Sequence, residues 1–571
     1  MEKWVVSAKK ADFQEIGRKF GVDPVIARLI RNRDQITDQE IDRYLYGKLS
    51  SLHSWKLLKD IEKLLDILTE KILEQKKIRI IGDYDIDGVC STYILLKGLS
   101  RAGAVADADI PDRIKDGYGI SRELIDLAAK AGIDTIITCD NGISAAEQIG
   151  YAKELGMTVL VTDHHEVPYE EEEDGTIHSI LPPADAVVNP KQPDCPYPFK
   201  GICGAMVAYK VIQGLYDRLE IPEKETEELI PFAAIATVGD VMDLKDENRI
   251  LVKDGLRRLQ NPENEGLKAL IRVNNLENRD ISAYHIGFVI GPCMNASGRL
   301  STAKRALRLL LAEDPSEAAD LAQDLKDLND SRKDMTAKGV EEAVEMVENT
   351  DLKNDRVLVI YLPDCHESLA GIIAGRVRER YVRPVFVLTK GEEGVKGSGR
   401  SIETYHMFHE LVKCKDLLAK FGGHPMAAGL SLPEENVEVL RKRLNENCTL
   451  TQEDMTEKIV IDVPMPMSYV TIPLIRQLSL LEPFGKGNTK PVFAQKNMKV
   501  LSCRILGKNK NVVKMDLSDD YGFRAEGVWF GEGEEFVRRL REKEKWDMIY
   551  YPSVNSYMGR ESIEMIIQNI R

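Results

Sequence analysis

The feature that most constrains the fold is a regular alternation of short apolar runs and helical patterns that begins near residue 76. Four runs have the length of buried strands, at 78–81, 104–110, 135–138 and 158–162. Segments with helical spacing, such as 89–99 and 122–129, separate them. Strands that alternate with helices form a parallel, doubly wound sheet. We therefore predict an α/β fold for this part of the chain.

The rest of the chain predicts four further parts around this domain. A polar helix follows Asp314, further strands and helices come after residue 356, and short alternating runs typical of a small β-barrel begin near residue 455. The predicted parts are a helical N-terminal segment (1–75), the first α/β domain (76–300), a connecting helix (301–352), a second α/β domain (353–450) and a β-barrel (455–571).

Length, charge and cysteine usage exclude several classes of protein. The 571 residues exceed what one hydrophobic core usually supports, and the formal net charge of −15 argues against a basic nucleic-acid coating protein. No apolar run approaches the length of a membrane span, so we expect no membrane association. The nine cysteines form no CxxC pair, which indicates neither a zinc site nor a disulfide framework and favours the reducing cytoplasm.

Acidic and imidazole side chains follow the predicted strands of the first α/β domain. The segment 83–87 contains three aspartates, Asp140 follows the next buried run, and Asp163-His164-His165 follows the one after it. Asp240 is a fourth candidate. Because the carboxyl ends of parallel strands line one crevice, we expect these groups to converge.

Four or more carboxylates in one crevice repel one another unless cations neutralise them. Carboxylate oxygens suit Mg²⁺ or Mn²⁺, and added imidazole shifts the preference toward Mn²⁺. Two such ions roughly 3.5–4 Å apart are a known device for hydrolysing phosphodiesters. The sequence therefore predicts two divalent metal ions, Mn²⁺ or Mg²⁺, and metal-assisted phosphodiester hydrolysis.

Two of these motifs resemble those of the DHH phosphoesterases. The triplet at 163–165 is the signature that names this superfamily, and the segment 82–88 is similar to its first motif. The resemblance implies metal ligands at Asp85, Asp87, Asp140, His164 and Asp240, with Asp140 bridging the two ions. It implies catalytic roles for His165 and Asp83. We expect His165 to face the scissile phosphate, because adjacent side chains on an extended segment point in opposite directions.

The chain departs from the superfamily at one position of the first metal site. Several members carry a histidine ligand four residues before the position of Asp85, where this chain has Ile81. We expect the first site to be weaker, or to be completed by water or by Asp83.

Further segments resemble the substrate-binding parts of the superfamily. They are 291–300, 397–401 and 421–429, and the segment 111–119 is expected near the terminal 5′ phosphate. Glycines let backbone N–H groups approach phosphate oxygens, and arginine adds charge-assisted donors. The expected substrate-binding residues are Arg113, Asn295, Arg299, Ser398, Arg400, Gly422, Gly423 and His424.

The segment 481–488 resembles the one that precedes the oligonucleotide-binding barrel in the single-strand-specific DNA exonucleases of this superfamily. The resemblance implies a metal-dependent 5′–3′ exonuclease that degrades single-stranded DNA to 5′ mononucleotides in repair and recombination, with a single-strand-binding protein and a helicase as partners. In the barrel we expect two or three of six aromatic residues to stack on bases and the others to fill the core. The six are Phe493, Phe523, Trp529, Tyr550, Tyr551 and Tyr557.

Two other functions compete with this interpretation. One is a DHH phosphodiesterase of short oligoribonucleotides or cyclic dinucleotides. Such enzymes are typically compact two-domain proteins, so the N-terminal segment and the barrel argue against it. The other is a catalytically inactive, replication-associated DNA-binding protein. The full set of acidic and histidine residues argues against loss of catalysis.

Overall fold

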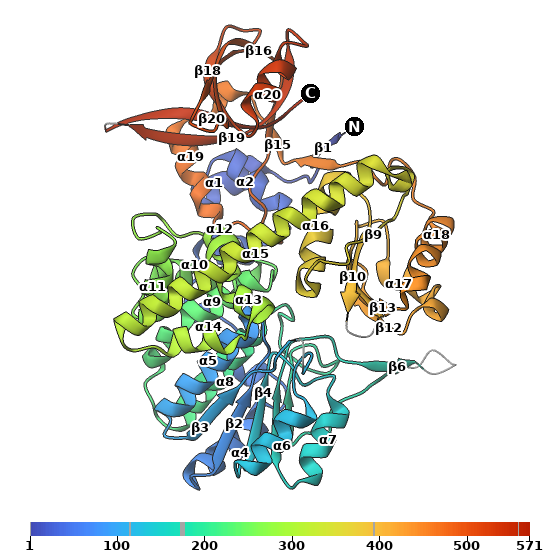
Figure 1. The fold of residues 1–571 in the computed structure, drawn as a ribbon. Helices are drawn as coiled ribbons and strands as arrows, with labels where there is room; N and C mark the ends of the chain where they lie inside the picture. The colour runs from blue at the N-terminus through green and yellow to red at the C-terminus, as the bar shows by residue number, and fades with distance from the viewer. Residues whose placement is uncertain (1, 114–115, 172–176, 392–393, 558) are drawn as a thin grey trace.

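The computed structural model describes residues 2–113, 116–171, 177–391, 394–557 and 559–571. Its first α/β domain is built on a five-stranded, fully parallel sheet of order β3-β2-β4-β5-β8 (Figure 1). The strands are β2 (Lys77–Ile81), β3 (Val105–Asp109), β4 (Thr135–Cys139), β5 (Thr158–Thr162) and β8 (Ala186–Val188). The predicted parallel α/β fold is confirmed.

Helices cover both faces of this sheet, because its strands are apolar on both sides. One face packs against α4 (Ile61–Leu73), α5 (Ile86–Arg101) and α8 (Gly204–Arg218). The other packs against α6 (Arg122–Lys130) and α7 (Ala146–Glu154). The sequence around Ser144 and Glu147 predicts a capping box for α7, and this is wrong. The helix begins at Ala146, and its N-cap residue, Ala145, makes no side-chain capping bond.

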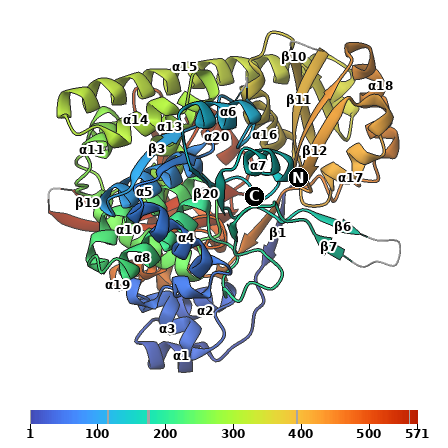
Figure 2. The same cartoon turned by 90° about the horizontal axis from the view of Figure 1, so that it is seen from below.

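A second group of helices closes the domain and leads out of it. They are α9 (Ile230–Gly239), α10 (Asp246–Leu259), α11 (Glu265–Val273), α12 (Ala283–His285), α13 (Gly291–Leu300) and α14 (Lys304–Leu311). The connecting helix α15 (Pro315–Asn349) then runs for 35 residues and carries the chain to the second α/β domain, which lies beside the first (Figure 2). The long connecting helix is confirmed.

The second α/β domain has a mixed sheet of order β12-β13-β11-β10-β9. Its strands are β9 (Leu358–Tyr361), β10 (Val385–Gly391), β11 (Gly394–Arg400), β12 (Lys420–His424) and β13 (Ala427–Leu432). Its main helices are α16 (Ala370–Tyr381), α17 (Met407–Val412) and α18 (Val437–Asn447). The strand β12 forms one edge of this sheet and is exposed at its glycines.

The C-terminal domain is the predicted barrel. Its sheet has the order β15-β16-β17-β18-β20-β19, and an additional pairing of β16 with β19 closes it. The strands are β15 (Val463–Pro464), β16 (Phe493–Leu506), β17 (Val512–Ser518), β18 (Arg524–Phe530), β19 (Trp546–Tyr557) and β20 (Arg560–Ile570), with α19 (Ile472–Leu478) and α20 (Gly533–Leu540) beside them.

The N-terminal helices share a hydrophobic core with this barrel, although they lie at the other end of the sequence. The core combines α2 (Pro24–Asn32) and α3 (Asp38–Tyr46) with barrel strands, and Figure 1 shows α2 and α1 (Phe13–Phe20) below the barrel. The strand β1 (Lys3–Val6) pairs with β14 (Lys458–Ile461), just ahead of the barrel. Both ends of the chain therefore stabilise one body.

A buried arginine joins this body to the first α/β domain. Arg249 of α10 is 2% exposed and donates hydrogen bonds to the carbonyl oxygens of Tyr44, Leu480 and Leu481 at 2.8–3.0 Å. Its guanidinium also lies 4.0 Å from the ring centre of Tyr44. Removal of the segment before the barrel would leave buried N–H groups of Arg249 without hydrogen-bond acceptors, which would destabilise the fold. Among the described residues, no helix is both long and apolar enough to cross a bilayer.

Candidate metal centre and substrate cleft

The first acidic motif forms the start of α5. Asp85 is the N-cap residue, and its Oδ1 accepts hydrogen bonds from the backbone N–H groups of Asp87 and Gly88 at 2.9 and 3.1 Å. Asn295 accepts a bond from the N–H of Ile86 at 2.9 Å. A carboxylate at a helix N-terminus is stabilised by the exposed N–H groups. Asn295 therefore holds the backbone of the metal motif in place. The sequence predicted that Asn295 binds substrate, but this contact lies closer to the metal centre.

Asp87 is fully buried and is held by the N-terminus of a second helix. Its two carboxylate oxygens accept hydrogen bonds from the N–H groups of Gly204 and Ala205 in α8, both at 2.7 Å. A Cβ atom on Gly204 would lie 2.8 Å from the Cβ of Asp140, so only glycine fits between the two aspartates. The sequence offered no motif that marks Gly204.

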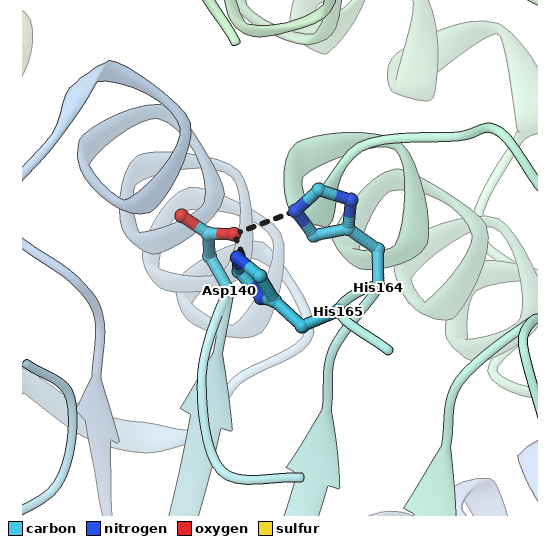
Figure 3. A group of neighbouring side chains, drawn as sticks. All are labelled: Asp140, His164 and His165. Carbon is cyan, nitrogen blue, oxygen red and sulfur yellow. Dashed lines mark ion pairs between the residues drawn. The ribbon is translucent and has the colours of Figure 1, made fainter. Parts of the chain in front are cut away.

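Asp140 lies at the centre of the site. It follows β4 with a left-handed backbone (φ 60°), which turns its carboxylate toward the crevice. Its Oδ1 lies 3.0 Å from Nε2 of His164 and 3.9 Å from Nδ1 of His165 (Figure 3). Among the described residues, three groups have ligand atoms within 4.8 Å of one another: Asp140 with His164 and His165, Asp87 with His164 and Asp240, and Asp83 with Asp85 and Asp140.

These carboxyl groups cannot all be ionised without a counter-charge. Burial and the charge of Asp85 raise the pKa of Asp83 to about 8, and burial with Asp87 raises that of Asp240 to about 8. The pKa of Asp140 is raised as well, by burial and by Asp87. Oδ1 of Asp140 and Nε2 of His164 lie close together, but neither these atoms nor Nδ1 of His164 makes a hydrogen bond of normal geometry within the described part of the chain, and all three are buried. Oxygen and nitrogen atoms that lack hydrogen-bond partners in an acidic cluster are suitable ligands for Mn²⁺ or Mg²⁺.

The two histidines do not diverge as the extended backbone predicted. Their ring centres lie 4.5 Å apart, and each ring has a nitrogen near Asp140 (Figure 3). They differ in their other contacts. Nδ1 of His165 lies 2.7 Å from the carboxylate of the buried Asp163, which leaves Nε2 for other partners. Burial alone would lower the pKa of His165, but the hydrogen bond to Asp163 and nearby carboxylates raise it to about 9.

The sequence motifs did not identify Tyr118 as a member of the site. Its hydroxyl donates to the carbonyl oxygen of Asp140 at 2.8 Å and lies 3.1 Å from Nδ1 of His165. Both rings border a cavity of about 210 Å³. Gly117 and Gly119 on either side have positive φ angles, of 80° and 71°. A tyrosine between two glycines was the available signal.

Ile81 is fully buried among apolar side chains, so it offers nothing to a metal ion. Asp83 lies instead beside Asp85 and Asp140, with ligand atoms within 4.8 Å. Of the three expected alternatives, a weaker site, completion by water and completion by Asp83, this position is compatible with the last.

All three predicted substrate-binding arginines, Arg113, Arg299 and Arg400, lie near this centre. Burial and the charges of Arg113, Arg332 and Arg400 lower the pKa of Arg299 to about 10, while Asp85 opposes that shift. Burial and Arg113 also contribute to a lowered pKa at Arg400. Nη1 of Arg299 donates to the carbonyl oxygen of Ser368 in the second α/β domain at 3.0 Å. Partly buried guanidinium groups that repel one another form a site for an anion.

The other predicted substrate-binding residues line the second α/β domain. The Ser398 hydroxyl accepts a bond from Nη1 of Arg400 at 3.1 Å. Gly422, Gly423 and His424 are exposed on the edge strand β12. The charge of Arg400 reaches His424, whose pKa is lowered by burial and by that charge. Gly422 and Gly423 thus lie in an exposed strand at the edge of the sheet.

In the barrel, most of the six candidate aromatic residues belong to the core, as expected for all but two or three of them. Phe493 and Tyr550 are fully buried, Tyr551 is 9% exposed, and Trp529 stacks on Phe536. Phe523 is partly buried against the same core, and the side chain of Tyr557 lies outside the described residues. Aromatic residues with large exposed fractions are instead Tyr521 and Phe530, at 97% and 60%.

Family models match three parts of the chain. They are the DHH family N-terminal domain at residues 77–237, the DHHA1 domain at 354–449 and the RecJ OB domain at 461–569. The chain is 35% identical to the single-stranded-DNA-specific exonuclease RecJ of Bacillus subtilis, over 99% of this chain and 70% of that protein. It is 33% identical to the Escherichia coli protein of the same name, over 96% of both. The chain belongs to the RecJ family.

A solved RecJ has the same architecture. The structure from Thermus thermophilus in complex with Mn²⁺ matches all of this chain and 79% of that one, with a TM-score of 0.83 and 27% identity. The same protein in complex with Mg²⁺ gives a TM-score of 0.78. The predicted DHH superfamily membership, the single-strand-specific exonuclease branch, and Mn²⁺ or Mg²⁺ as cofactors are confirmed.

Proposed function

We propose that this RecJ-family chain hydrolyses single-stranded DNA from its 5′ end and releases 5′ mononucleotides. The observation that carries the proposal is the buried metal centre beside a cluster of three arginines. Asp83, Asp85 and Asp140 would hold one ion, and Asp87, His164 and Asp240 the other, with Asp140 between them. When bound, the ions supply an activated water and stabilise charge on the phosphate.

The protein groups perform the remaining steps. His165 keeps its ring orientation through Asp163 and Tyr118, and its Nε2 can donate a proton or hydrogen bond to the phosphate. Arg113, Arg299 and Arg400 would bind the terminal 5′ phosphate, which places the first internucleotide bond at the metal centre. Polarity then follows from the position of the anion site.

Cellular context completes the proposal. All nine cysteines are free thiols, eight of them in buried or partly buried positions, which supports action in the reducing cytoplasm. We place the enzyme in repair and recombination, where a single-strand-binding protein and a helicase would supply its substrate. The barrel is the part that would hold the single strand.

Strand-end labelling tests this function. We expect Mn²⁺-dependent release of mononucleotides from 5′-phosphorylated single-stranded DNA, slower release from 5′-hydroxyl ends, and no activity with EDTA. A 3′-labelled strand should shorten progressively while keeping its label. Preferential cleavage of RNA dinucleotides or of cyclic dinucleotides would instead support the oligoribonucleotide alternative, and binding without hydrolysis would support the inactive one.

A further inference from the structure

The loop ahead of the barrel reaches the metal domain next to Asp240. The carbonyl oxygen of Lys486 accepts a hydrogen bond from the N–H of Leu244 at 2.7 Å. Gly487 has a φ of 72°, and a Cβ atom there would lie 3.0 Å from the Cβ of Asp243. This close backbone approach fixes the position of Lys486 relative to Asp243, which lies three residues after Asp240.

The Lys486 side chain is exposed and only weakly paired. It is 61% exposed, and its Nζ lies 3.7 Å from Oδ1 of Asp243. The same carboxylate also lies 3.6 Å from Nζ of Lys245. One carboxylate thus faces two ammonium groups, which leaves a positive charge for another partner. An exposed pair at this distance contributes little to stability.

Lys486 lies where the metal domain meets the segment that leads into the barrel. Its carbonyl oxygen and its ammonium group lie against Leu244 and Asp243, in the loop that follows Asp240. An exposed cation therefore stands close to the metal centre, on the side from which the chain continues into the barrel.

From this placement we propose that Lys486 binds a backbone phosphate of the single strand on the 3′ side of the scissile bond. It rests on the proposed function, in which the 5′ end lies at the arginine cluster. A strand that runs from the metal centre to the barrel has to pass the loop that joins them. The exposed ammonium group of Lys486 would guide the strand there without taking part in the chemistry.

Binding measurements in a hydrolysis-deficient background test this role. We compare Asp140→Asn with Asp140→Asn/Lys486→Ala, using a fluorescent 5′-phosphorylated 15-nucleotide strand. We expect the Kd to rise about two- to fivefold, the range for one exposed charge contact. The slope of log K against log salt should fall by about 0.7, the value for one phosphate on a single strand. Lys486→Arg should restore both quantities.

Lys245→Ala is the matched control, because it removes the other lysine on Asp243. The charge of Lys245 helps to lower the pKa of Asp34 in the N-terminal segment. Loss of the Lys245 side chain should therefore leave strand binding unchanged. An equal effect of Lys245→Ala, or an unchanged salt slope for Lys486→Ala, would overturn the proposal. The otherwise wild-type Lys486→Ala enzyme should also keep its kcat/KM on a 5′-phosphorylated dinucleotide. An equal loss there would show that Lys486 supports the Asp240 loop instead. Failure of the wild-type enzyme to release 5′ nucleotides would count against the proposed function and leave the binding result intact.

Discussion

The metal centre and the arginine cluster are neighbouring sites of opposite charge, the first largely buried and the second partly buried. The carboxylates come from one domain and are fixed by backbone N–H groups, as at Asp85 and Asp87. The arginines come from both α/β domains, with Arg113 and Arg299 in the first and Arg400 in the second. The chemistry therefore depends on one domain, whereas recognition of the strand end depends on how two domains are placed.

The two sites neutralise each other only in part. Burial and like charges raise the pKa of Asp83 and lower that of Arg299, and the charge of Asp85 offsets only some of the shift at Arg299. Each site therefore needs an external ion of opposite sign, a metal cation in one case and a phosphate in the other. Substitutions that remove a charge from one site should leave the function of the other intact, and this separation can be tested.

The largest effect is expected from Asp140→Asn. Asp140 contacts both proposed ion sites, so its loss removes water activation and charge stabilisation together. We expect kcat to fall about a thousandfold or more, while binding of the 5′ phosphate persists. Steady-state kinetics at saturating Mn²⁺ and strand-binding assays measure the two quantities. Asp107→Asn, at an exposed ion pair with Arg79, is the control. Near-normal turnover of Asp140→Asn would show that Asp140 is no bridging ligand.

The histidine pair should show the next largest effect. His165→Ala is expected to lower kcat about 10²- to 10⁴-fold, the usual contribution of a general acid or base, with Mn²⁺ affinity largely retained. His164→Ala should lose both, because its buried ring faces Asp87, Asp140 and Asp240 at 3.0–3.7 Å. Calorimetric titration with Mn²⁺ separates the two variants. Equal loss of metal affinity in both would assign His165 to the metal as well.

A smaller effect is expected at the arginine cluster. Arg400→Ala should lower kcat/KM on 5′-phosphorylated strands about 10- to 100-fold, as expected for loss of a charge-assisted hydrogen bond. Strands with a 5′ hydroxyl should be hardly affected, because they lack the group that Arg400 binds. The ratio of the two substrates is the readout, and Mn²⁺ affinity serves as the control. A uniform loss on both substrates would place Arg400 outside the end-binding site.

The sequence predicted the parallel α/β sheet, because its strands alternate with helices, and the convergence of the acidic residues, because strand ends in a parallel sheet share one edge. It could not predict the contacts that come from distant backbone, such as the N–H of Gly204 on Asp87. It also placed the two histidine rings on opposite sides, since alternation describes a regular strand. The segment after β5 is irregular, so Asp163 draws His165 back toward Asp140.

The barrel shows the same limit for aromatic residues. Composition indicates that a small barrel has both core and surface aromatics, but it does not say which is which. Phe493 and Tyr550 face the core shared with the N-terminal helices, a partner that no local pattern reveals. The link through Arg249 has a practical consequence. Deleting everything from residue 455 would also expose the first α/β domain, so point substitutions at Tyr521 or Phe530 test the barrel more cleanly.

The smallest expected effect is on folding stability. The direction in which stability changes with pH distinguishes a metal centre from an ordinary acidic surface. The folded-state pKa values of Asp83 and Asp240 are raised from 3.8 to about 8. Between pH 4 and pH 8 the metal-free folded chain therefore keeps protons that the unfolded chain releases. The contribution of these groups to folding stability consequently falls as the pH rises through that range. Metal ions bind the ionised carboxylates, so the increase in Tm on adding Mn²⁺ should be larger at pH 8 than at pH 6.

Asp240→Asn provides the matched control for this last comparison. The amide has no proton to release, so the metal-free variant should lose less stability between pH 6 and pH 8 than the wild type. Mn²⁺ should also raise the Tm of this variant less, because Asp240 is one of the three expected ligands in the group with Asp87 and His164 and an amide binds the ion more weakly. Thermal melts with EDTA and with Mn²⁺ at both pH values give the four numbers needed. If the Mn²⁺ shift in Tm were the same at both pH values in the wild type, the carboxylates would already be ionised without metal. The mutual repulsion on which the comparison of the two sites depends would then be relieved by the protein itself.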